Sequence, residues 1–151
     1  MNPRKYMQRE TTVVAKSKFM LKKEHNKNTQ ELAKLNRELA AQMILLASQT
    51  GDTEPLKQAV DALRAVDELY TAHTTPREKA EIRQTLADTL LTLGRANDDI
   101  TALEHSIIAY RDAITLASML GDQKLRKALK RNYNLAKNLL GNRGTSFKGA
   151  A

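Results

Sequence analysis

Few residues of this chain have the types and spacing that catalysis or metal binding requires. The 151 residues include no cysteine, which excludes a thiol nucleophile, a disulfide and a Cys-ligated metal centre. The three histidines are His25, His73 and His105, and none has another histidine or a carboxylate at zinc-site spacing. Glu104 adjoins His105, but adjacent residues of a helix point apart. We therefore predict surface histidines and no metal site.

Two glycine-containing segments and the paired carboxylates also lack the pattern of an active site. GNRG (141–144) and GDTEPLK (51–57) do not have the glycine, lysine and hydroxyl spacing of a phosphate-binding loop. Asp67–Glu68 and Asp98–Asp99 are typical of helix ends and solvated faces. No Ser–His–Asp set follows from the sequence without assuming a fold. The sequence thus predicts no catalytic residue and no cofactor, in a protein that is not an enzyme.

The composition predicts that helices make up the fold. Hydrophobic residues are 41% of the chain and aromatic ones only 4%, so Leu, Ala, Ile, Val and Met must form the core. Glycine (6) and proline (3) are sparse, and residues that favour helices are abundant. No apolar run approaches the roughly 20 residues that cross a bilayer, and the N-terminus lacks the apolar region of a secretory signal. We predict a cytoplasmic, all-α protein without stable membrane anchoring.

Apolar residues at helical spacing divide the chain into three segments. Residues 1–28 are predicted to be basic and partly helical or disordered, 29–140 a helical domain, and 141–151 a flexible Gly-rich tail. The first main helix should begin at Thr29. Its predicted buried stripe is Leu32, Leu35, Leu39, Met43 and Leu46. The other helices are predicted over 54–72, 76–93, 99–119 and 123–140.

The predicted turns carry their own local signals. Gly51 suits the left-handed backbone conformation that often ends a helix. Thr75 precedes a proline and has Glu78 three positions on, which is a capping box at the start of a helix. Asp99 and Asp122 are placed to cap the two helices that follow them.

An internal repeat relates the first two main helices to the next two at a shift of 47 residues. The shift places Leu39 on Leu86 and Ala40 on Ala87, and it crosses the turn without a gap. A further shift of 49 places NLAKNLL (134–140) on TLADTLL (85–91). Amphipathic helices of similar length also align by chance, which explains the apolar matches but explains the matched turn lengths less well. Because a helical hairpin cannot bury its apolar face alone, repeated hairpins are expected to stack.

In these residues the chain resembles a tetratricopeptide repeat over about residues 31–140, best in LADTLLTLGRANDDITALEHSIIAYRDAI (86–114). The small residue of the family's first helix would be Ala87, and the small-aromatic-small series of its second helix would be Ser106, Tyr110 and Ala113. The resemblance implies antiparallel hairpins stacked as a short solenoid of about five main helices. The unit of 47 to 49 residues exceeds the usual length of about 34, and the early Trp and closing Pro are missing.

Such a solenoid presents a concave surface lined by the first helix of each hairpin. We predict that this surface binds a partner protein within a larger assembly, as an adaptor or scaffold, and that an acidic helix or peptide would suit its basic members. The oligomeric state is left open. The candidate groove residues are Arg37, Gln42, Arg83, Gln84, Asp88, Asn134, Lys137 and Asn138.

The net charge of +8 is concentrated at the two ends of the chain. Residues 1–28 hold eight Lys/Arg against two Glu, residues 120–151 hold eight against one Asp, and residues 29–119 hold nine against fourteen acidic residues. Nucleic-acid or other polyanion binding is therefore the alternative function. Its candidate residues are Lys16, Lys18, Lys22, Lys23, Lys124, Arg126, Lys127, Lys130 and Arg131.

Overall fold

The computed structural model describes the backbone of residues 3–70 and 74–149, and the side chains of residues 20, 23, 24, 26–70 and 74–142. Within these ranges every regular element is a helix, which confirms the all-α prediction. The helices are α1 (Pro3–Thr50), α2 (Glu54–Leu69), α3 (Pro76–Ala96), α4 (Ile100–Leu120) and α5 (Gln123–Gly149).

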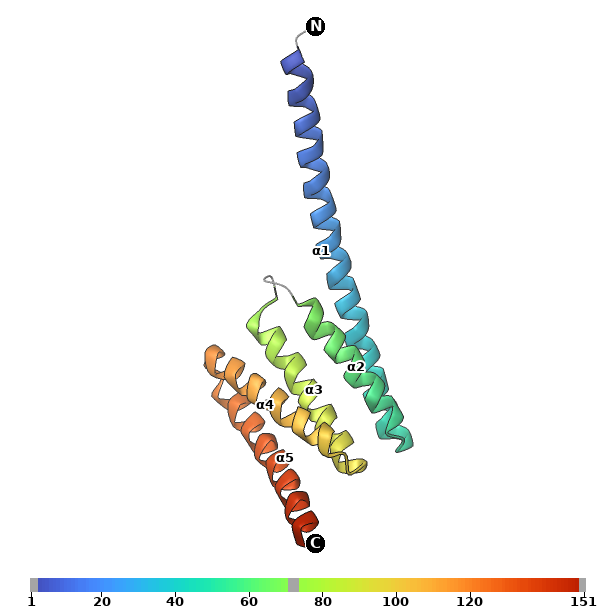
Figure 1. Ribbon diagram of the computed structural model, residues 1–151, viewed down its shortest axis with the longest axis vertical. Coiled ribbons are helices and arrows are strands. Elements are labelled where there is room, and N and C mark those ends of the chain that lie inside the picture. The colour runs from blue at the N-terminus through green and yellow to red at the C-terminus, as the bar shows by residue number, and fades with distance from the viewer. Residues whose placement is uncertain (1–2, 71–73, 150–151) are drawn as a thin grey trace.

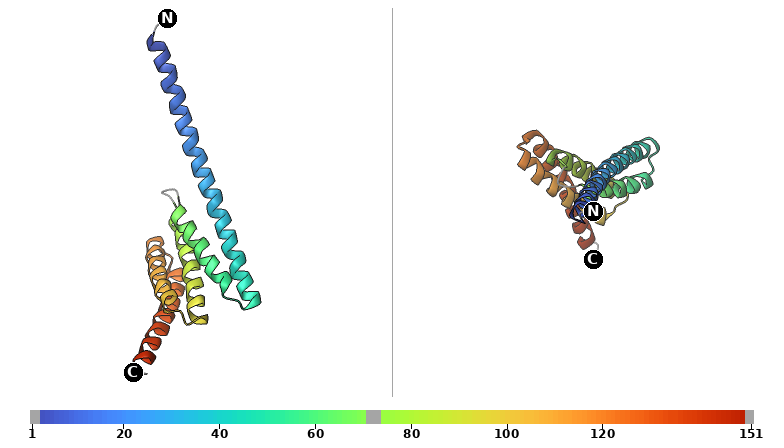
Figure 2. Two further views of the ribbon diagram at one scale, coloured as in Figure 1. Left: turned by 45° about the vertical axis from the view of Figure 1, so that its right-hand side comes forward. Right: turned by 90° about the horizontal axis from the view of Figure 1, so that it is seen from above.

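Successive helices run antiparallel and lie side by side in chain order, as Figure 1 shows. Each helix packs against the next, and α3 also contacts α5. The N-terminal half of α1 extends well past the other helices in both side views (Figures 1 and 2). The fold is therefore a stack of antiparallel helices with one long helix projecting from its edge.

Helix α3 lies between two hydrophobic clusters and contributes a different face to each. Ile82, Leu86 and Leu90 belong to the cluster that α1 and α2 build. Ala87 and Leu91 belong to the cluster that α4 and α5 complete around the buried Tyr110 and Leu129. Because both faces of α3 are apolar, this helix joins the two halves of the stack into one body.

The buried face of α1 is not the predicted one. Ala33, Ala40 and Ala47, seven residues apart, are buried in the cluster with α2. The leucines of the predicted stripe keep 41% to 61% of their surface exposed, and Met43 is half-buried. Small side chains let two helix backbones approach closely, so α2 packs on the alanines and the leucines are turned away from it. The prediction of a buried leucine stripe in α1 is wrong.

The predicted turn signals act as expected. The Thr75 side chain accepts a hydrogen bond from the Glu78 N–H (3.2 Å), and Asp99 and Asp122 cap α4 and α5 in the same way. Gly51 has φ 74°, in the left-handed region. These signals could be predicted because a cap depends on residues only two or three positions away.

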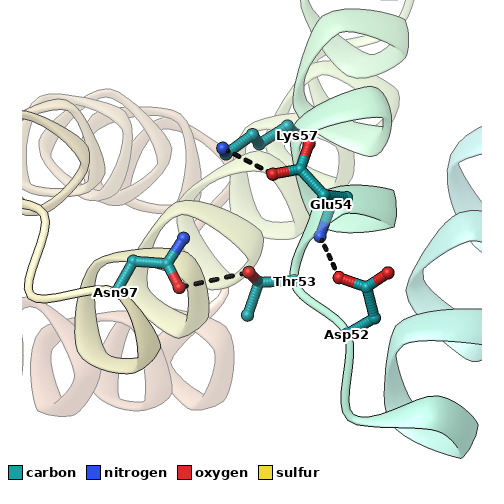
Figure 3. A network of polar contacts seen from close by, with 5 residues as sticks. All are labelled: Asp52, Thr53, Glu54, Lys57 and Asn97. Carbon is teal, nitrogen blue, oxygen red and sulfur yellow. Dashed lines mark hydrogen bonds and ion pairs between the residues drawn. The ribbon is translucent and has the colours of Figure 1, made fainter.

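The turn between α1 and α2 is tied to the turn between α3 and α4 (Figure 3). Asp52 Oδ1 accepts from the Glu54 N–H at 3.0 Å, and Lys57 Nζ lies 2.8 Å from Glu54 Oε1. Thr53 Oγ1 donates to Asn97 Oδ1 at 3.1 Å, across 44 residues of sequence. This bond joins the lower ends of the two hairpins.

Several helix ends differ from the predicted positions. Thr29 lies inside α1, because the preceding KKEHNKN (22–28) contains no proline or glycine and the helical hydrogen bonds continue through it. Helix α2 ends at Leu69, where Tyr70 takes an extended conformation, and the predicted end at Ala72 lies outside the described residues. Helix α3 continues past Leu93 to Ala96. Helix α5 continues past the predicted end at residue 140 to Gly149, since no proline interrupts 141–149.

Candidate functional site

A long groove runs between α1 and α3, with α2 as its floor. Three hollows of about 420, 450 and 530 Å³ follow one another along it. Arg37 and Glu78 line both the first and the second hollow, and Ile44 and Thr85 line both the second and the third. Because each hollow shares residues with the next, the three form one continuous depression, which we call the α1–α3 groove.

The walls of the α1–α3 groove differ in charge, and its floor is apolar. At one end of the groove, the end closer to the N-terminus of α1, helix α1 contributes Lys34 and Arg37. Helix α3 contributes Glu78 and Glu81 on the opposite wall. Leu56, Leu63 and Leu69 of α2 lie along the floor. Of the six charged residues that line the groove, two are basic and four are acidic: Lys34, Arg37, Asp52, Glu78, Glu81 and Asp88.

Tyr70 lines the first hollow and keeps its hydroxyl group beneath the surface. Its oxygen is buried, and the described residues give it no hydrogen-bond partner. Burial raises the pKa of Tyr70, with Glu78 and Asp67 adding to the effect and Arg37 opposing it. The hydroxyl is therefore protonated at neutral pH.

Asp88 lines the third hollow and is held there by both of the following helices. Its Oδ1 accepts from the hydroxyl of Tyr110 on α4 and, at 3.3 Å, from Asn132 Nδ2 on α5. Burial of Tyr110, together with the Asp88 carboxylate that it bonds, raises the pKa of the phenol far above its ordinary value. The second cluster therefore fixes the orientation of a residue at the groove wall.

The structure brings two of the eight predicted groove residues, Arg37 and Asp88, to the α1–α3 groove. Arg83 instead forms an ion pair with Asp67 (3.5 Å) and lines a smaller hollow of about 200 Å³ between α2, α3 and α4. The remaining five lie elsewhere on the described surface: the exposed Gln42, the half-buried Gln84 and the exposed Asn134, Lys137 and Asn138 of α5. Lys137 Nζ lies 5.3 Å from the centre of the Tyr133 ring.

The sequence reasoning missed most of the acidic wall. Glu78, Glu81, Thr85, Asp88 and Thr92 follow one another at three- and four-residue spacing and line the groove from α3. This spacing places them on one side of a helix. A search for polar stripes beside the apolar one would have found this signal in the sequence.

The histidine that the structure describes in full has a side-chain partner. A guanidinium nitrogen of Arg64 lies 2.9 Å from Nδ1 of His105, so this ring nitrogen accepts the bond. His73 and the side chain of His25 lie outside the described residues. Within the described part, no three His, Asp or Glu side chains are grouped as they would be around a metal ion.

A basic face covers the outer side of α5. Lys124, Lys127 and Arg131 are exposed and share one side of the helix because they are three and four residues apart. Lys130 is also exposed, whereas Arg126 is half-buried. The Nε atom of Arg126 is buried and has no hydrogen-bond acceptor among the described residues. Lys23 of α1 is exposed, and the side chains of Lys16, Lys18 and Lys22 lie outside the described ones. Among the described helices, none is both long and apolar enough to cross a bilayer.

Comparison with known proteins gives no independent indication of function. No family model, curated protein or solved structure matches the chain.

Proposed function

We propose that this chain is a non-enzymatic protein-interaction scaffold that binds a helix or an extended segment of another protein in the α1–α3 groove. The groove is the observation that supports this proposal most directly. Its lining on α1 reaches from Asn26 to Ser48, which corresponds to about 33 Å of helix. A peptide segment of five to six helical turns, roughly 20 residues, fits this length.

The lining of the groove favours a partner segment that is apolar on one side and basic on the other. Ala41, Ile44 and Ala96 offer an apolar surface that excludes water from a bound apolar stripe. The carboxylates of α3 outnumber the cations of α1 among the lining residues, so basic side chains of the partner should lie against α3. This charge balance replaces the acidic partner that the sequence led us to expect.

A solenoid of tetratricopeptide-like hairpins is the architecture that we propose for this scaffold. Several residues that the 47-residue shift pairs have matching burial, which supports the proposal: Leu63 and Tyr110 are both buried, as are Val66 and Ala113. The large apolar residues of α1 differ, since the exposed Leu39 pairs with the buried Leu86. The small residue of the first helix is buried in each unit, at Ala40, Ala87 and Ala136. Matching burial at matching positions is expected of repeated units that pack on one another in the same way.

Site-specific photo-crosslinking tests the proposed function. A benzophenone amino acid is placed either at Ser48, which lines the groove, or at its exposed neighbour Gln49, which does not. Adjacent helical residues differ in direction by about 100°, so the two probes sample different surfaces of one helix turn. We expect a protein adduct, identified by mass spectrometry, from position 48 and not from position 49. Equal adducts from both positions, or none from position 48, would contradict the proposal.

Polyanion binding is the second candidate, and the basic face of α5 is the observation that favours it. Lys124, Lys127 and Arg131 are all exposed on one side of the helix. Electrophoretic shift of duplex DNA and RNA at about 50 mM salt tests it, since phosphate contacts are strong at low salt and weaken steeply as salt is added. A shift that is abolished when Lys124, Lys127 and Arg131 are all replaced by alanine would support this candidate. The absence of any shift at low salt would exclude it.

A further inference from the structure

Helix α1 carries a stripe of large apolar side chains that the rest of the described chain leaves open. The exposed fractions of Leu32, Leu35, Leu39 and Leu46 are 49%, 61%, 43% and 41%. On α3, the positions 47 residues later than the last three are Ile82, Leu86 and Leu93, and these are buried in the cluster with α2. The corresponding face of α3 is therefore covered by a neighbouring helix, α2. A stripe of this kind thus fits against another helix.

The order of residues in the stripe is the same in both directions from Leu39. Leu32 and Leu46 lie seven residues before and after it, and Leu35 and Met43 lie four residues before and after it. In an antiparallel pair of such helices centred on Leu39, Leu32 meets Leu46, Leu35 meets Met43, and Leu39 meets its own equivalent. Every residue of the stripe then faces another, Met43 with the part of its side chain that the cluster with α2 leaves exposed. This is the self-complementarity that a two-fold interface requires.

We infer that a second copy of this chain covers the stripe, with the two α1 helices antiparallel and a two-fold axis at Leu39. The charge of the chain favours this direction over a parallel pair. Residues 1–28 hold eight Lys/Arg against two Glu, and α1 continues through them. A parallel pair places these two basic segments side by side, where they repel each other, whereas an antiparallel pair sends them to opposite ends of the dimer.

The paired surface is distinct from the α1–α3 groove. Ala40 and Ile44 point toward the groove and α2, whereas Leu39 and Leu46 leave the helix on another side. The dimer therefore leaves both grooves accessible, and each dimer presents two of them. Failure of the dimer would leave the proposed function standing, and failure of partner binding would leave the dimer standing.

The mass of the protein in solution is the first test. At about 100 µM, a dimer with a micromolar dissociation constant is the dominant species. Light scattering on a size-exclusion column should then give twice 16.9 kDa for the full chain. Leu39→Glu should give the monomer mass with unchanged helix content by circular dichroism, since Leu39 is exposed in the single chain. Leu45→Glu, at a leucine with 57% exposure outside the stripe, should stay dimeric.

Cysteine crosslinking tests the direction, and the absence of native cysteine makes each result unambiguous. A disulfide forms only where the two Cα atoms come within about 7 Å. We expect mild oxidation to link Leu39→Cys to itself, and to link Leu32→Cys to Leu46→Cys when the two variants are mixed. Leu32→Cys alone and Leu45→Cys alone should stay unlinked. A monomeric wild type, or self-linking of Leu32→Cys as a parallel pair requires, would overturn the inference.

Discussion

The hydroxyl of Tyr110 on α4 donates a hydrogen bond to the carboxylate of Asp88 on α3, and Asn132 of α5 donates to the same oxygen. Tyr110 is fully buried, whereas Asp88 reaches the wall of the α1–α3 groove. Three helices therefore meet at one carboxylate. This arrangement couples the packing of the C-terminal half of the stack to the shape of the proposed binding surface.

Replacing Tyr110 by Phe should lower the free energy of unfolding by about 1–2 kcal/mol. The ring still fills its place in the core, but Asp88 loses the hydrogen bond from Tyr110 and keeps the one from Asn132. Urea unfolding followed by circular dichroism measures the change. A variant as stable as the wild type would show that the hydrogen bond contributes nothing to stability.

The stability advantage of Tyr110 over Phe should also depend on pH. The pKa of Tyr110 is raised in the folded chain from an ordinary value of 10.0, so the folded state holds the phenol proton more tightly than the unfolded state. The contribution of the protonated Tyr110 phenol to the free energy of unfolding is complete below pH 10. It is lost as the pH rises above 10, at up to about 1.4 kcal/mol per pH unit. Unfolding of both proteins between pH 8 and about 11 measures this loss. Parallel curves for the two proteins would contradict it.

Gly94 lies in direct contact with Leu103 where α3 and α4 cross. A Cβ on Gly94 would come within 2.8 Å of Leu103 Cγ and Cδ2 and within 3.2 Å of its backbone nitrogen. Leu103 is completely buried, so it has no space to move into. Gly94→Ala should therefore destabilise the fold by about 1–3 kcal/mol, although alanine is the better helix former.

Gly141→Ala is the matched control for this prediction. Gly141 also lies inside a helix, but an added Cβ would have nothing within 4 Å. Helix propensity alone then decides, and the substitution should stabilise α5 by about 0.5–1 kcal/mol. The midpoint of thermal unfolding should be highest for Gly141→Ala, intermediate for the wild type and lowest for Gly94→Ala. A higher midpoint for Gly94→Ala than for Gly141→Ala would refute the contact argument.

The sequence predicted those parts of the fold that depend on neighbouring residues. Thr75, Asp99, Asp122 and Gly51 all occupy the caps and turns expected of them. The continuous helix through residues 22–28 was not predicted, because a change from apolar to charged residues marks a loss of core contacts and does not require the helix to end.

The orientation of α1 could not be predicted because two stripes of similar spacing compete on it. Hydrophobicity favours the leucines, but α2 packs on Ala33, Ala40 and Ala47. Which stripe is covered depends on how closely the two backbones approach, and that is a tertiary property. Because the alanine stripe and not the leucine stripe of α1 faces α2, Arg37 lines the groove and Gln42 lies off it.

The most direct test of the proposed function measures how tightly the partner identified by photo-crosslinking binds two variants, Ala41→Trp and Gln42→Trp. Both residues are exposed on α1, but only Ala41 lines the groove, where an indole would occupy the space above Leu63 and Ile82. We predict that Ala41→Trp weakens partner binding at least tenfold, a loss of about 1.4 kcal/mol, while Gln42→Trp leaves the affinity within about twofold. Equal affinities for the two variants would contradict binding in the α1–α3 groove.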